Sequence, residues 1–136
     1  RPVVVPLPVG GGMSVSSPPQ WLEVLIVEDH HQSRELLRLL LTVAGYRVIA
    51  TSTVHDAVAH LNGQTHVLLD LNLLDGSGVD VLRSIRAQYP NTVVALTTAE
   101  RDDSPLMAGA MLHHPQAVFQ KPLDVNRLLG WLQTQW

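Results

Sequence analysis

The feature that most constrains the fold is an alternation of short apolar runs with longer segments of helical pattern, repeated five times after residue 21. The short runs are rich in β-branched residues and apolar along their length, as is typical of strands covered on both faces. Strands that alternate with helices in this way form a parallel sheet. We therefore expect a doubly wound α/β domain with a five-stranded parallel sheet and helices on both faces. The strands are predicted at 24–27, 46–50, 66–70, 92–98 and 117–120.

The segments between these runs carry the helical patterns. The first, 31–45, has Leu36, Leu40 and Val43 at helical spacing, and Gly45 is in position to end the helix. The remaining helices are expected at 53–63, at 78–90, at 104–113 and after Asp124.

Composition narrows the class of protein. The chain has 136 residues, which suits one domain with a proper core, and 46% of them are hydrophobic. A net charge of -3 gives no electrostatic reason to expect nucleic-acid binding. The absence of cysteine excludes disulfides, thiol catalysis and zinc–thiolate sites. No apolar run approaches the roughly 20 residues of a membrane span, and the first residues lack the features of a signal peptide. We therefore expect a cytoplasmic domain without membrane contact.

The amino-terminal segment differs from the rest of the chain. Residues 1–20 are dense in Pro, Gly and Ser and show no periodicity. We interpret them as a flexible linker or the tail of a preceding domain. Residues 21–136 form the predicted folded domain.

Acidic residues lie where two of the predicted strands end. Glu28 and Asp29 follow the first strand, and Asp70 ends the third. In a doubly wound sheet, ligands bind outside the carboxyl ends of the strands, at the point where the strand order reverses. These three carboxylates are expected to converge there, and their mutual repulsion favours a bound cation. Oxygen ligands without cysteine or a histidine set indicate a hard ion such as Mg²⁺, with Mn²⁺ as an alternative.

The last two strands end in further functional groups. The fourth ends in Thr97-Thr98, which supplies a hydroxyl, and the fifth is followed by Lys121-Pro122, which supplies an ammonium group. A carboxylate nucleophile, a metal site, a hydroxyl and a lysine are the groups that phosphoryl transfer requires.

From Trp21 to Trp136 the chain resembles the receiver domain of two-component response regulators. Four pieces carry the resemblance, namely VEDH, VLLDLNLLDGSG, LTTAE and QKP. The resemblance implies a flavodoxin-like fold with strand order 2-1-3-4-5. It also implies a phospho-acceptor signalling domain of a two-component phosphorelay, whose partner is a histidine kinase or a phosphotransfer domain. A homodimer and a place in a hybrid histidine kinase are compatible with it.

The same resemblance assigns roles to the matching residues. Asp70 would accept the phosphoryl group from a phosphohistidine, and Lys121 would pair with it. Thr98 fits the family's hydroxyl position, because Ala99 follows it. Asp29 and Asp70 would hold Mg²⁺ directly, Glu28 would act mostly through water, and the backbone carbonyl of Asn72 would complete the ligands. Self-phosphorylation and self-dephosphorylation at Asp70 would be the only reactions, so the domain is a switch more than an enzyme.

The sequence departs from the family pattern at several positions. Leu74 stands where the family usually has Pro, and Val118 stands where it often has Tyr or Phe. Phe119 is one residue off that aromatic position, so it should face the other side of its strand. An early Ala-Gly-Ala at 108–110 indicates a short or irregular fourth helix.

Two other functions compete with this interpretation. A phosphatase of the haloacid dehalogenase type also uses an aspartate nucleophile with Mg²⁺, but it needs a carboxylate where Asn72 stands. A receiver-like interaction module that is never phosphorylated is the second, and Val118 is its mild support.

Several other residues are better explained by structural roles than by catalysis or metal binding. Asp75 precedes a glycine and is interpreted as a turn residue. The seven histidines are expected at the surface. Trp131 is expected to pack in the core and Trp136 to lie at a frayed terminus.

Overall fold

The structure is a computed structural model, and it describes residues 17–136. Most of the predicted linker, residues 1–16, lies outside the described residues. Within the rest of that segment, Pro18 is buried and its ring lies close to Gly45, whose φ is +100°. The packed part of the chain therefore begins slightly before Trp21.

The main sheet has the predicted topology. All its strand pairs are parallel, and the order β2-β1-β3-β6-β7 is the predicted order 2-1-3-4-5, since β6 and β7 are the fourth and fifth strands of this sheet. Its strands are β1 (Glu23–Val27), β2 (Arg47–Thr51), β3 (His66–Leu69), β6 (Val93–Thr98) and β7 (Ala117–Gln120). A small antiparallel hairpin, β4 (Asn72–Leu73) with β5 (Gly76–Ser77), was not predicted.

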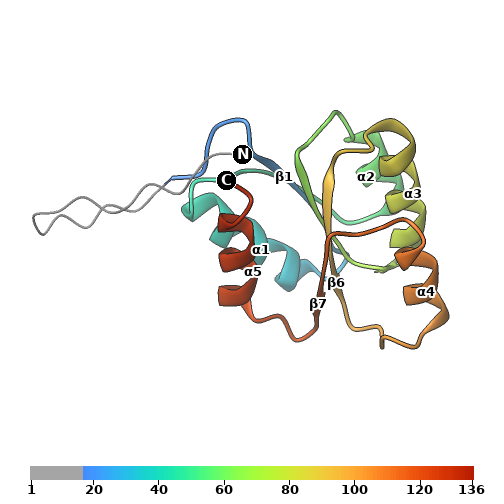
Figure 1. Cartoon of the computed structure of the whole chain (residues 1–136). Helices are drawn as coiled ribbons and strands as arrows, with labels where there is room; N and C mark the ends of the chain where they lie inside the picture. The colour runs from blue at the N-terminus through green and yellow to red at the C-terminus, as the bar shows by residue number, and fades with distance from the viewer. Residues whose placement is uncertain (1–16) are drawn as a thin grey trace, which may run out of the picture.

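Helices cover both faces of the sheet, as predicted (Figure 1). One face carries α1 (His31–Val43) and α5 (Val125–Gln133), and the other carries α2 (Val54–Ala59), α3 (Gly78–Gln88) and α4 (Pro105–Met111). The fourth helix is short, as expected.

Each helix begins at a side chain that accepts a hydrogen bond from a backbone N–H of the first turn. The acceptors are His30, Thr53, Ser77, Ser104 and Asp124. These local signals explain why the helix starts could be predicted closely.

Successive residues of each strand pack alternately into two separate hydrophobic cores, one on each face of the sheet. Leu25 and Val27 point to the α2–α3–α4 side, whereas Val24 and Ile26 point to the α1–α5 side. The same alternation places Val118 and Phe119 on opposite faces, which confirms the prediction for Phe119.

The residues whose spacing predicts the first helix do not form its buried side. Leu36 and Val43 are exposed, at 51% and 78%, whereas Leu37 and Leu41 are buried. This leucine-rich helix contains two overlapping stripes at helical spacing, so spacing alone does not identify the buried one. The packing of α1 against β1 and β2 selects the second stripe.

The expectation for Trp136 is also wrong. Its indole Nε1 donates to the Tyr46 hydroxyl at 3.0 Å, and its ring packs on the α1–α5 core. Trp131 packs there as expected, edge-on to Phe119. The carboxyl-terminal end of the chain therefore packs at the edge of the sheet where its parallel strands begin.

Candidate functional site

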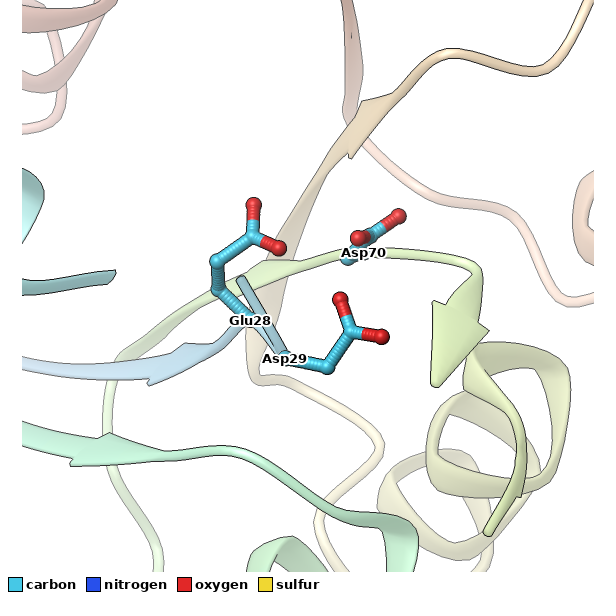
Figure 2. A group of neighbouring side chains, drawn as sticks. All are labelled: Glu28, Asp29 and Asp70. Carbon is cyan, nitrogen blue, oxygen red and sulfur yellow. The ribbon is translucent and has the colours of Figure 1, made fainter. Parts of the chain in front are cut away.

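Three carboxylates meet at the carboxyl edge of the sheet, as predicted. Glu28 and Asp29 follow β1 and Asp70 follows β3, the neighbouring strand. Figure 2 shows the three side chains around one small space. One oxygen of each carboxylate lies within 4.8 Å of the others.

The sheet itself fixes the backbone of two of these residues. The Glu28 N–H donates to the Thr51 carbonyl at 3.0 Å, and the Asp70 N–H donates to the Val27 carbonyl at 2.9 Å. These bonds extend the parallel ladders one residue beyond the strands. The buried strands before them therefore hold the carboxylates at the edge.

Lys121 joins the cluster from the loop after β7. Its Nζ donates to Glu28 Oε1 at 2.6 Å and to Asp70 Oδ2 at 3.0 Å. The Glu28 and Asp70 side chains are only 1% and 5% exposed, and that of Lys121 is 24% exposed. The backbone of Lys121 is held by its N–H, which donates to the Thr98 carbonyl. Lys121 is also the chain's only lysine.

Burial and pairing shift the ionisation of this group. Burial raises the pKa of Glu28, and the hydrogen bond from Lys121 opposes this only in part. For Lys121, burial alone would lower the pKa, but the bonds to Glu28 and Asp70 outweigh it and raise the pKa. The ammonium form of Lys121 is therefore strongly favoured.

The donor set fits a hard divalent cation. The cluster contains three carboxylates and one ammonium group, which pairs with Glu28 and Asp70, so it keeps an excess of negative charge when all are ionised. Carboxylate oxygens at this spacing are ligands that Mg²⁺ accepts.

The hydroxyl predicted for the site lies at the end of β6. Thr98 is fully buried, and its Oγ1 accepts from the Glu100 N–H at 2.9 Å. Thr97, the other candidate, is on the opposite face of the strand by the alternation of side chains.

Asn72 and Glu100 form a bridge beside Asp70. The Asn72 N–H donates to Asp70 Oδ1 at 3.2 Å, and its side-chain amide donates to Glu100 Oε2 at 2.9 Å. The hydrogen bond from the Asn72 amide lowers the pKa of Glu100, and a weaker effect in the same direction comes from a side-chain hydrogen bond with Ser104. The sequence pattern did not single out Glu100 as a site residue, although its place two residues after Thr98 was an available signal.

Asp75 is a turn residue, as predicted, because it lies between β4 and β5. Its carboxylate has a further role that the sequence did not reveal. Oδ1 accepts from the Val54 N–H at 2.7 Å and Oδ2 from the His55 N–H at 3.0 Å, at the start of α2. These backbone bonds lower the pKa of Asp75. The residue is not in the acidic cluster.

The fold and the site together define a doubly wound α/β domain with an acidic, lysine-paired site at the carboxyl edge of its sheet. Residues 24–133 match the family described as the response regulator receiver domain. The chain therefore belongs to the receiver domain family of two-component response regulators, whose members are phospho-acceptor signalling domains.

Curated relatives agree with this assignment. The chain is 35% identical over 112 residues to the transcriptional regulatory protein KdpE of Mycobacterium tuberculosis, covering 81% of this chain and 49% of that protein. It is 32% identical over 105 residues to the luminescence regulatory protein LuxO of Vibrio campbellii, covering 76% and 23%. The chain thus spans about half or less of these relatives.

A solved structure supports the same conclusion. The non-phosphorylated HemR receiver domain of Leptospira biflexa aligns with a TM-score of 0.75 at 25% identity, covering 83% of this chain and 92% of that one. Among the helices of residues 17–136, none has the length and apolar character that crossing a bilayer requires.

Proposed function

We propose that Asp70 is the phosphoryl acceptor of this receiver domain. The observation that carries the proposal is the position of its carboxylate, which Lys121 holds at 3.0 Å inside a cluster of acidic groups. In the transfer, an Asp70 oxygen forms a bond to phosphorus while the bond from phosphorus to the donor imidazole nitrogen breaks. The electron pair stays on that nitrogen, which then takes up a proton from solvent.

The neighbouring groups have separate roles in this proposal. Lys121 neutralises an oxygen of the incoming phosphoryl group, and Thr98 provides the hydroxyl that contacts it. Glu28, Asp29, Asp70 and the carbonyl of Asn72 would hold Mg²⁺ or Mn²⁺, and Glu28 would act mostly through water. The ion would offset negative charge on the transferred oxygens.

The partner is proposed to be a histidine kinase or phosphotransfer domain. A groove of about 210 Å³ lies beside Lys121, between α1 and the loop before α5. Its lining includes Leu36, Pro122 and Leu123. Leu36, which lines this groove with Lys121, is 51% exposed, and Leu39 on the same helix is 54% exposed, so both provide apolar surface. This surface supports docking that brings a phosphohistidine to Asp70.

The wider setting is also a proposal. We place the domain in the cytoplasm, with residues 1–20 as a linker and residues 21–136 as the receiver. Since the relatives are longer, the domain is proposed to act within a larger signalling protein, of which a hybrid histidine kinase is one form. Association of two copies is compatible with this role. Beyond the reactions at Asp70, no catalysis by this chain is proposed.

The proposal is tested by incubation with Mg²⁺ and acetyl phosphate, followed by mass spectrometry. We expect one acid-stable, hydroxylamine-sensitive phosphoryl adduct, absent in Asp70→Asn. Asp75→Asn is the matched control, because Asp75 lies in the same loop outside the acidic cluster. Absence of the adduct from the wild type would favour an interaction module, and multiple turnover of an added phosphoester would favour a phosphatase.

A further inference from the structure

Arg34, on the first helix, contacts the backbone of the acidic residues. Its Nη1 donates to the Glu28 carbonyl at 3.0 Å and to the Asp29 carbonyl at 3.3 Å. These are the two consecutive residues whose carboxylates enter the acidic cluster. One guanidinium nitrogen therefore holds both peptide groups of the loop between β1 and α1.

These carbonyls lie beyond the end of the β1 ladder. β1 ends at Val27, and the last sheet bonds at this edge use the Glu28 N–H and the Val27 carbonyl. Within residues 17–136, Arg34 is the donor found for the carbonyls of Glu28 and Asp29. The sheet therefore does not determine how these two peptide groups are oriented.

The position of Arg34 in the helix points to the same role. It is the fourth residue of α1, and the first turn of this helix contains no acidic residue. A cation near a helix amino terminus interacts unfavourably with the helix dipole. The guanidinium is nevertheless held in place, because Nη2 also donates to His31 Nδ1 at 3.1 Å. The bonds to the loop carbonyls compensate for this location.

We propose that Arg34 is a positioning residue for the metal-binding loop. By fixing the two carbonyls on the α1 side, it helps to orient the Glu28 and Asp29 side chains, which Figure 2 shows turned to the same space as Asp70. The Glu28 carboxylate is also held by Lys121 and by the His30 N–H, so the effect of Arg34 is expected to be largest at Asp29. The planar guanidinium suits this task because its donors have fixed directions. The inference rests on the proposed metal-dependent function.

Charge and positioning predict opposite effects on metal binding. As a cation close to the acidic cluster, Arg34 repels Mg²⁺, so its removal should tighten binding if charge alone matters. If Arg34 orders the loop, its removal should weaken binding instead. Outer groups that orient metal ligands typically change metal affinity about 10–100-fold when they are lost.

The test compares Arg34→Met with Arg38→Met. Both variants remove one positive charge from α1 and keep an aliphatic stem, but Arg38 pairs with Glu35 of its own helix. Isothermal titration with Mg²⁺ is expected to show about tenfold weaker binding for Arg34→Met and wild-type binding for Arg38→Met. Hydrogen exchange without metal is expected to be faster at residues 28–31 in Arg34→Met alone. Arg34→Lys keeps the charge, and we expect an intermediate affinity.

The outcomes separate this inference from the proposed function. Unchanged or tighter Mg²⁺ binding by Arg34→Met, with normal binding by the wild type, overturns the role of Arg34 alone. If the wild type itself binds no Mg²⁺, the proposed metal site fails and the inference falls with it. Should Arg34→Met not fold, Arg34→Lys decides: wild-type affinity and wild-type exchange at residues 28–31 would overturn the inference.

Discussion

At the scale of single residues, the two ion pairs of Lys121 can be tested most directly, because one substitution removes both. Lys121→Met leaves the buried carboxylates of Glu28 and Asp70 without their ammonium partner. Because an unpaired buried charge is costly, we expect a loss of about 2–4 kcal/mol in the free energy of unfolding without Mg²⁺. Mg²⁺ should recover more stability in this variant than in the wild type, because it replaces the missing positive charge.

Urea unfolding with and without Mg²⁺ measures both effects. Gln120→Met is the control, since the neighbouring Gln120 is exposed and its amide contacts Asp102. A Lys121→Met variant as stable as this control without Mg²⁺ would show that the ion pairs do not stabilise the fold.

The residues of the site differed in how far the sequence could predict them. Glu28, Asp29 and Asp70 could be placed together because each follows a strand of recognisable pattern, and parallel strands end at one edge. Glu100 and Arg34 make their contacts through side chains whose directions depend on packing. A local pattern does not encode such directions, so these contacts appear only in the folded structure.

At the scale of elements, α2 depends on a residue from another part of the chain. This helix has only six residues, and Asp75 accepts from two of its first N–H groups. Asp75→Asn is therefore expected to lower the melting temperature at neutral pH, because it removes a charge that favours the helix amino terminus. Glu35→Gln is the control, since Glu35 pairs within its own helix with Arg38 and lies outside the first turn of that helix.

The difference in melting temperature between wild type and Asp75→Asn should become smaller as the pH falls. The pKa of Asp75 is lowered in the folded state from an ordinary value of 3.8, so its contribution is present above that value. It is lost as the pH falls through the folded pKa. Thermal unfolding at neutral and acid pH should show the gap between Asp75→Asn and wild type closing in acid. A gap that persists after protonation would contradict the capping role.

The start of α3 depends on a glycine that touches the acceptor loop. A Cβ at Gly78 would overlap the backbone carbonyl of Asp70 and crowd Leu71. Gly78→Ala is therefore expected to cost about 1–3 kcal/mol or more and to slow phosphorylation, because the acceptor backbone must move. A Cβ at Gly130, in α5, meets nothing within 4 Å. Gly130→Ala should stabilise the protein by about 0.5–1 kcal/mol.

Chemical unfolding and phosphorylation rates measure both variants. Equal stability changes for Gly78→Ala and Gly130→Ala would mean that the acceptor loop accommodates the added methyl group.

For some helices and strands, the sequence pattern did not predict the packing or the existence of the element. The first helix was predicted with nearly correct bounds, yet its buried side was missed, because Leu36 and Leu37 belong to competing stripes. The tiny β4–β5 hairpin was missed because two-residue strands carry no periodic signal. In α3, by contrast, Val79, Leu82 and Ile85 at helical spacing are buried, since polar residues on the other side of the helix leave one apolar stripe.

At the scale of the whole molecule, the two ends of the sheet have different chemistry. The carboxyl edge carries the acidic cluster, whereas the amino-terminal edge carries His66 beneath the end of α5. The expectation that all seven histidines lie at the surface is wrong for His66, which is 3% exposed because it begins the central strand β3 beneath α5. Its ring lies edge-on to Trp131 with ring centroids 6.2 Å apart, and its Nε2 is 3.4 Å from Gln135 Oε1. The packing of α5 against the sheet thus includes a group that can take up a proton.

Protonation of His66 should therefore weaken the folded state in mild acid. Burial lowers the pKa of His66 from 6.5, although the bond to Gln135 opposes this. Because the unfolded chain binds the proton more tightly, stability is fully present above that value and falls as the pH drops through the folded pKa. Urea unfolding between about pH 5 and pH 7.5 should show a shallower pH slope for His66→Gln than for the wild type. His60→Gln, at an exposed position, should keep the wild-type slope. If His66→Gln keeps it as well, proton uptake by His66 is not linked to unfolding.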